Sequence, residues 1–275
     1  MTNTSIAGSL KYKLKIWYLL SLIVALFVAL VSIIGLLYKD SIYLSEDLLQ
    51  TFIPNDIINL SIGLPFLLIS LLLTKRGKVI GLLCWPGALF YILYIFLPYV
   101  LSVPFNILFL PYLIILSLSI YTLIGIIVSI DQNAIKNKLI ENIPNKTFGG
   151  ILVGLSVFII IRQVALIINA ILNNSIIDQQ ELAVWIDDLI IGSPIMLIGG
   201  YFLWKKRPLG YTVGAGLFIS YTLLSFALIP FLVIQSYLRN TAIDLIGIII
   251  LLIMTMICAI PFFYFVKGLN KELIH

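Results

Sequence analysis

Long apolar runs separated by short polar connectors make up nearly the whole chain. The runs cover about residues 16–38, 56–74, 79–101, 107–130, 149–173, 187–204, 209–235 and 241–266. A helix that crosses a bilayer needs roughly 20 apolar residues, because the hydrocarbon core is about 30 Å thick. The pattern therefore predicts an all-α integral membrane protein with about eight transmembrane helices. The first run is too long for the core of a signal peptide, so we expect a retained first span.

Composition supports this class. Hydrophobic residues make up 61% of the 275 residues and charged residues only 11%, whereas soluble domains carry about 25% charged residues. This excludes a water-soluble fold, and the connectors are too short to form a separate soluble domain. Cys84 and Cys258 lie inside apolar runs, where they are expected to be small buried hydrophobes.

Basic residues gather on alternate connectors. One side of the predicted membrane would carry most of them: Lys11, Lys13, Lys15, Lys75, Arg76, Lys78, Lys136, Lys138, Lys146, Lys205, Lys206, Arg207, Lys267 and Lys271. Cytoplasmic connectors are enriched in Lys and Arg, so both termini are predicted to be cytoplasmic and the protein to lie in the cell membrane. Most acidic residues fall on or near the other side: Asp40, Glu46, Asp47, Asp56, Asp178, Glu181, Asp187, Asp188 and Asp244. The net charge of +5 is therefore no sign of nucleic-acid binding, and the expected partner is the lipid bilayer.

Several features recur after a shift of 129 residues. Different features in one register, including the basic turns TKRGK and WKKRP, indicate an internal duplication. Two parallel four-helix halves are predicted, 1–135 and 136–275, related by a rotation about the membrane normal because each half has an even number of spans. The aligned pairs are Pro65 with Pro194, Gly81 with Gly210 and Gly87 with Gly216.

Each half has a carboxylate before a proline in its second span. Asp56 precedes Pro65 and, after a two-residue gap, matches Asp187 or Asp188. An aspartate at an outward-facing helix N-terminus would cap free amides and complement the helix dipole. A pair of proline-broken spans is also typical of a transporter binding site. Both interpretations are open at this stage.

Arg162 lies deep in the fifth apolar run, within FIIIRQVAL. A charge at that depth costs a few kcal/mol or more, so it normally faces the bundle interior and has a partner. We expect that partner to be Asp187, Asp188 or Asp244 near the outer side. The arginine would either bind an anionic substrate or form a structural ion pair.

Aromatic residues are concentrated in CWPGALFYILYIFLPY, which begins at Cys84. Trp85 lies near the inner third of its span, and Tyr91 and Tyr94 can share one helix face. These residues predict either a polar stripe along a cavity or a tyrosine-rich helix interface.

Sequence motifs of common catalytic sites are absent. His275 is the only histidine, and no nucleophile elbow, CxxC pair, phosphate-binding loop or dinucleotide fingerprint occurs. We therefore assign no catalytic residue and expect no cofactor and no metal site.

The stretch from Tyr38 to Asp131 resembles a group of uncharacterised prokaryotic polytopic membrane proteins. The matching segments are NDIINLSIGLPFLLISLLLTKRGK, GLLCWPGALFYILY and PFNILFLPYL. The resemblance covers about a third of the chain and carries no activity with it. It implies that a single unit is formed by Asp56, Pro65, Trp85, Gly87 and Tyr91.

Three functions are compatible with these features: a small transporter or permease, a non-catalytic membrane protein with an assembly, immunity or sensing role, and, least supported, a lipid-modifying enzyme. The substrate and the oligomeric state are undetermined. The candidate binding residues are Arg162, Asp56, Asp187, Asp188, Asp244, Tyr91 and Trp85.

Overall fold

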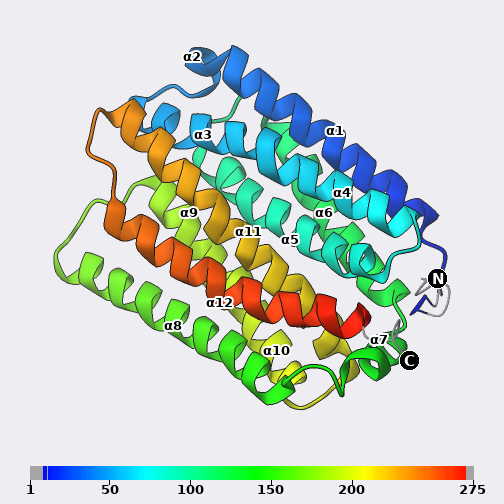
Figure 1. The fold of residues 1–275 in the computed structure, drawn as a ribbon. Coiled ribbons are helices and arrows are strands. Elements are labelled where there is room, and N and C mark those ends of the chain that lie inside the picture. The colour runs from blue at the N-terminus through cyan, green and yellow to red at the C-terminus, as the bar shows by residue number, and fades with distance from the viewer. Residues whose placement is uncertain (1–8, 11, 271–275) are drawn as a thin grey trace.

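The computed structural model describes residues 9, 10 and 12–270 as a bundle of long helices (Figure 1). The elements in chain order are α1 (Lys15–Leu37), α2 (Lys39–Ile42), α3 (Glu46–Ile58), η2 (Asn59–Gly63), α4 (Leu64–Lys75), α5 (Val79–Ser102), α6 (Phe109–Ser129), α7 (Gln132–Leu139), α8 (Asn145–Leu172), α9 (Gln179–Asp187), η3 (Asp188–Gly192), α10 (Ser193–Trp204), α11 (Pro208–Arg239) and α12 (Leu245–Asn270). The two η elements are single π-helical turns that join α3 to α4 and α9 to α10.

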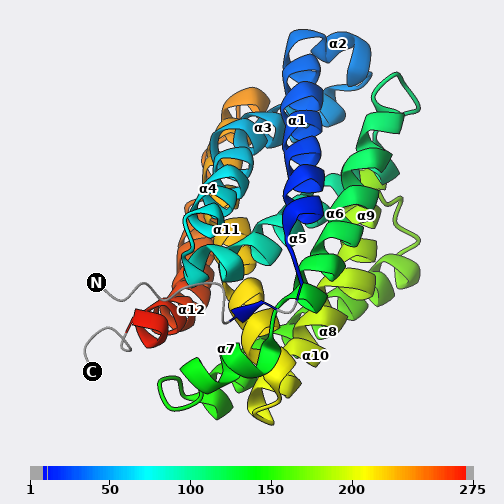
Figure 2. The ribbon, with the colours of Figure 1, turned by 90° about the vertical axis from the view of Figure 1, so that its right-hand side faces the viewer.

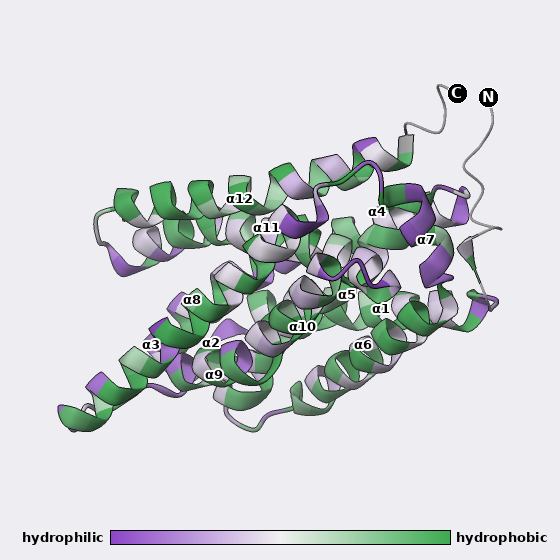
Figure 3. Cartoon of the chain, turned by 90° about the horizontal axis from the view of Figure 1, so that it is seen from below, coloured by the Kyte–Doolittle hydropathy of each residue, from purple (hydrophilic) through white to green (hydrophobic). Residues whose placement is uncertain are grey.

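Within the described residues, eight helical stretches are long and apolar enough to cross a membrane. Two of them are composite, because α3, η2 and α4 form one span (Glu46–Lys75) and α9, η3 and α10 form another (Gln179–Trp204). Apolar residues run along the helices, while the connectors and α7 are largely polar (Figure 3). The prediction of an all-α polytopic membrane protein is confirmed.

The long helices run side by side between two ends of the molecule. One end carries α2, and the other carries α7 together with the start of α1 and the end of α12 (Figures 1 and 2). α5 is the most buried span and packs against α4, α6 and α11, whereas α8 and α12 are the least buried. The core is therefore built around α5 and α11, and the exposed apolar faces of α8 and α12 suit contact with lipid.

The two composite spans begin about ten residues earlier than the apolar pattern predicts. α3 starts at Glu46, and the Ser45 hydroxyl caps it by accepting a hydrogen bond from the Leu48 amide at 3.3 Å. Asp56 is consequently roughly 15 Å along the helix from its start. Asp187 is the last residue of α9, not its first. The capping interpretation of these aspartates is wrong, because each lies well inside its span and not at the start of it. The apolar pattern missed the true starts because charged residues lie in the first turns of α3 and α9.

The turns that end the two composite spans have the same hydrogen bonds. The Lys78 amide donates to the Leu73 carbonyl at 3.0 Å, and the Arg207 amide donates to the Phe202 carbonyl at 2.8 Å. One residue in each turn has a positive φ, 78° at Gly77 and 54° at Lys206. Both connectors therefore close in the same backbone geometry. The matching residues of the two turns are 129 positions apart.

α5 and α11 cross where two glycines meet. A Cβ built on Gly87 would lie 2.7 Å from the Gly216 carbonyl oxygen, which is closer than real Cβ atoms approach. The Ser220 hydroxyl donates to the Gly87 carbonyl at 2.7 Å across the same contact. Small residues let two membrane helices approach backbone to backbone, and here they bring the two most central spans together.

Candidate functional site: two buried carboxyl clusters

Three carboxyl groups are buried inside the spans. Asp56 and Asp187 are 0% exposed and Asp188 is 7% exposed. Among the residues that the structure describes, no lysine or arginine is buried beside them. Buried carboxylates normally pair with a cation or collect hydrogen bonds, because an isolated charge in an apolar medium is strongly disfavoured. The donors that each carboxyl receives therefore decide what it can do.

The first cluster surrounds Asp56. The Tyr43 hydroxyl donates to one carboxyl oxygen at 2.6 Å, and the Tyr99 hydroxyl of α5 donates to the other at 2.9 Å. The Asn59 amide donates in turn to the Tyr99 oxygen at 3.4 Å. The Phe52 ring lies against both tyrosines, with ring centroids 5.5 Å from Tyr43 and 4.5 Å from Tyr99. Both oxygens of Asp56 thus have a neutral donor held in place by aromatic packing.

Tyr43 lies between the first two spans. Burial raises the pKa of its hydroxyl well above the usual value for tyrosine, and the adjacent Asp56 carboxyl raises the pKa further. Both effects disfavour the phenolate. Tyr43 therefore remains a proton donor to Asp56 at any physiological pH.

The second cluster surrounds Asp188, the first residue of η3. Tyr94 of α5 donates to one carboxyl oxygen, and the Gln163 side-chain amide of α8 donates to the other. The neighbouring Asp187 has no hydrogen-bond partner on either oxygen, and the Gln163 carbonyl oxygen and the Tyr221 hydroxyl are also buried without a partner. The two adjacent aspartates therefore differ sharply in how they are satisfied.

Both clusters lie at π-helical turns. Asn59 opens η2 and Asp188 opens η3, and a proline follows each turn at Pro65 and Pro194. Asn59 and Asp188 are 129 residues apart, so an alignment without a gap pairs Asp188 with Asn59. The sequence comparison had paired it with Asp56. Single π turns inside α-helices are frequent at functional sites, because the inserted residue changes the direction of nearby side chains and interrupts the regular backbone hydrogen bonds.

Arg162 does not face the bundle interior. Its side chain is exposed on α8, whereas the next residue, Gln163, is fully buried and bonds to Asp188. The prediction of an inward arginine paired with an outer carboxylate is therefore wrong. Consecutive helix residues point about 100° apart, so an error of one position in helical phase exchanges an inward side chain for an outward one.

Asp244 lies apart from both clusters. It is exposed before α12, and its carboxyl accepts a hydrogen bond from the Gly247 amide at 2.9 Å. An aspartate that accepts from an amide of the first helical turn acts as an N-cap. The structure thus gives Asp244 a capping role and not a position beside the other aspartates.

The predicted aromatic residues have separate surroundings. Trp85 is fully buried, and its indole N–H donates to the Ser21 hydroxyl at 2.8 Å, which ties α5 to α1. The Tyr91 hydroxyl is buried without a partner, and its ring lies against Gly63 of η2. Tyr91 therefore contacts the π turn η2, whereas Trp85 helps to pack α5 against α1.

The candidate binding residues taken from the sequence leave out six polar residues of the clusters: Tyr43, Asn59, Tyr94, Tyr99, Gln163 and Tyr221. Gln163 and Asn59 could have been found as isolated amides inside apolar runs, because a polar group in a membrane span needs an internal partner. Nothing in the sequence connects Tyr43 or Tyr221 to the aspartates. Their proximity arises only from helix packing.

The eight apolar spans, with polar clusters enclosed among them, define a polytopic helical membrane protein. No family model, curated protein or solved structure matches the chain. The resemblance to the group of prokaryotic membrane proteins therefore stays a prediction. Across the described residues, no three His, Cys, Asp or Glu side chains gather where they could hold a metal ion.

Proposed function

We propose that this protein is a small transporter whose substrate path passes the two carboxyl clusters. The observation that carries the proposal is the burial of Asp56, Asp187 and Asp188 inside spans that are each interrupted by a π turn and a proline. Ionisable groups within membrane spans are costly and typically mark ion or substrate pathways. Paired broken spans in two related halves are the usual frame for such a pathway.

The packing of the helices supports two related halves, 1–135 and 136–275, whose junction falls within α7. α3 of the first half packs on α11 of the second, and α9 of the second packs on α5 of the first. Gly87 and Gly216, which correspond in the proposed duplication, contact each other. Equivalent residues meet at a two-fold axis, so the two halves would be related by a rotation about the membrane normal.

α5 offers a means of coupling the clusters. It supplies Tyr99 to Asp56 in its own half and Tyr94 to Asp188 in the other half. A shift of α5 relative to either composite span would therefore change the donors at both clusters. Rigid-body movement of one half against the other is how many transporters expose a fixed site to each side in turn.

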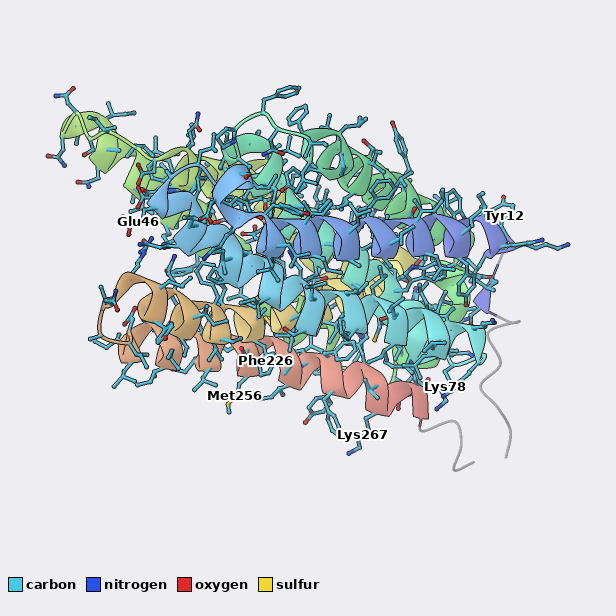
Figure 4. The ribbon with its side chains drawn as sticks, turned by 90° about the horizontal axis from the view of Figure 1, so that it is seen from above. Tyr12, Glu46, Lys78, Phe226, Met256 and Lys267 are labelled. Carbon is cyan, nitrogen blue, oxygen red and sulfur yellow. The ribbon has the colours of Figure 1, made fainter. Side chains whose placement is uncertain are left out.

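We also propose that the chain lies in the cell membrane with the α7 end facing the cytoplasm. Tyr12, Lys78 and Lys267 lie toward that end, and Glu46 lies at the other (Figure 4). Reporter fusions after Lys78, Lys146 and Arg207 are expected to report cytoplasm, because basic residues are retained on that side. Fusions near Glu46 and Glu181 should report the outside, and one inverted connector would contradict the assignment.

Water access to the second cluster tests the transporter proposal without knowledge of the substrate. Ser193 follows η3 and is fully buried. In a background with Cys84 and Cys258 replaced by alanine, Ser193→Cys is expected to react with a charged, membrane-impermeant thiol reagent added to either side of oriented membrane vesicles. A fixed site with alternating access is reached by water from both sides over time.

Ser119→Cys in the same background is the matched control. Ser119 is also fully buried, but it lies in α6, and no residue of α6 donates a hydrogen bond to Asp56 or Asp188. It should therefore stay unmodified. If Ser193→Cys folds and reacts from neither side, the clusters are sealed, and the non-catalytic membrane role becomes the better account of the protein.

A further inference from the structure

Two of the three buried aspartates accept a hydrogen bond on each carboxyl oxygen, and the third accepts none. Asp56 accepts from Tyr43 and Tyr99, one donor on each oxygen. Asp188 likewise has a donor on each oxygen. Asp187 is fully buried, and neither of its oxygens has a partner. Of the three carboxyls, Asp187 alone is left for a ligand to satisfy.

The ionisable and polar groups around Asp187 and Asp188 lie on η3, α5, α8, α11 and α12. Asp188 adjoins Asp187 on η3, and Tyr94 of α5 and Tyr221 of α11 lie within electrostatic range of both carboxyls. Cys258 of α12 lies near Tyr221. On α8 the inward residue is Gln163, while Arg162 is exposed. Thus no basic side chain faces Asp187 from the described residues, and the adjacent ionisable group is another carboxyl, that of Asp188.

The unpartnered atoms in this cluster are mostly acceptors. They comprise both oxygens of Asp187 and the carbonyl oxygen of Gln163, which is itself 0% exposed. The hydroxyls of Tyr221 and Ser193 are also without a partner, and a hydroxyl can either donate or accept. The Gln163 amide group is committed to Asp188, so its oxygen is free to face a cation. Acceptors collected in an apolar, buried place favour a positively charged occupant.

We propose that Asp187 takes up and releases a monovalent cation, a proton or an alkali metal ion, within the second cluster. The proposal rests on the transporter function proposed above, where this ion would drive or accompany the substrate. Asp188 keeps Tyr94 and Gln163 as fixed donors, and Asp56 keeps its two tyrosines. The ion-carrying step is thereby confined to one half of the molecule, although both halves contain a π turn and a buried carboxyl.

Infrared spectroscopy of the purified full-length protein in lipid nanodiscs tests this directly. In choline chloride, without alkali ions, the wild type is expected to show the C=O band of a protonated carboxyl, and Asp187→Asn should remove that band. Asp56→Asn is the matched control and should leave it in place. If Asp187→Asn gives the same carboxyl spectrum as the wild type, Asp187 carries no exchangeable cation and the proposal is overturned.

The salt in the buffer separates the two ions. A band that persists when sodium or potassium chloride replaces choline chloride identifies the proton as the occupant. A band that disappears identifies an alkali ion, because the metal then takes the place of the proton on the carboxylate.

A measurement on the wild type covers the case in which Asp187→Asn does not fold. A hydrophobic carbodiimide adds to a protonated carboxyl in an apolar site, and peptide mass spectrometry locates the adduct. The adduct is expected on Asp187 in choline chloride and not on Asp56 or Asp188. An unmodified Asp187 with an adduct on Asp188 would overturn the proposal.

These results are independent of the thiol-labelling test of transport. A neutralised Asp187 in a protein whose Ser193→Cys variant is never labelled would be an ion-binding site without a transport path. A labelled Ser193→Cys variant with an unchanged carboxyl spectrum in Asp187→Asn would be a transporter that uses a different group.

Discussion

Gly87→Ala is expected to lower the free energy of unfolding by about 1–3 kcal/mol, the usual cost of an extra methyl group in a packed interior. The new Cβ would lie 2.7 Å from the Gly216 carbonyl oxygen, with Ile219 and Ser220 crowded on the same side. A backbone oxygen inside a helix cannot rotate away as a side chain can. The α5–α11 crossing would therefore have to separate, and both helices lie at the centre of the bundle.

Gly216→Ala is the matched control for this contact. The nearest atom to a Cβ built on Gly216 is the Gly87 amide nitrogen at 3.6 Å, which is an ordinary packing distance. A second control, Gly154→Ala on the exposed side of α8, would place the methyl group where nothing lies within 4 Å. Both controls should stay close to the wild type, or slightly above it, because alanine favours a helix over glycine.

Thermal unfolding in detergent, followed by size-exclusion chromatography, measures all three variants. A Gly87→Ala protein as stable as the Gly216→Ala protein would show that the crossing is looser than the structure has it. The contact between Gly87 and Gly216 would then no longer support the proposed two-fold axis.

Tyr99→Phe is expected to cost about 1–3 kcal/mol of unfolding free energy, the penalty for leaving a buried acceptor without its donor. The substitution keeps the ring that packs against Phe52 and Phe96 and removes only the hydroxyl. Asp56 would then keep a single donor, Tyr43, and the Asn59 amide would lose its acceptor. The loss therefore falls on two buried polar groups at once.

Tyr112→Phe separates this effect from a general effect of hydroxyl removal. The Tyr112 ring lies 5.2 Å from that of Tyr99 and is equally buried. Its hydroxyl lies near that of Tyr43 but completes no hydrogen bond, either to Tyr43 or to Asp56. Removing an unpartnered buried hydroxyl is neutral or stabilising. Unfolding in mixed micelles of increasing SDS content would compare the variants, and equal stability of Tyr99→Phe and Tyr112→Phe would contradict the hydrogen-bonded cluster around Asp56.

The sequence by itself determined the class of the protein. Crossing a bilayer depends on the hydrophobicity of one continuous segment, so each apolar run could be recognised without knowledge of its neighbours. The order of the spans and of the connectors between them follows from the same pattern, and in the described residues the structure agrees except that the two composite spans begin about ten residues earlier. Where the pattern failed, as at the start of α3, charged residues such as Glu46 and Asp47 lie in the first turn and lower the local hydrophobicity.

Only the tertiary structure decided which polar residues belong together. Whether Arg162 or Gln163 faces inward depends on the rotation of α8 about its axis, and a uniformly apolar helix gives almost no sequence signal for that rotation. The bond from Tyr94 to Asp188 joins residues 94 positions apart, and the one from Tyr99 to Asp56 joins residues 43 positions apart. Such pairs form because α5 packs between the two composite spans, and this packing depends on the shapes of many side chains at once.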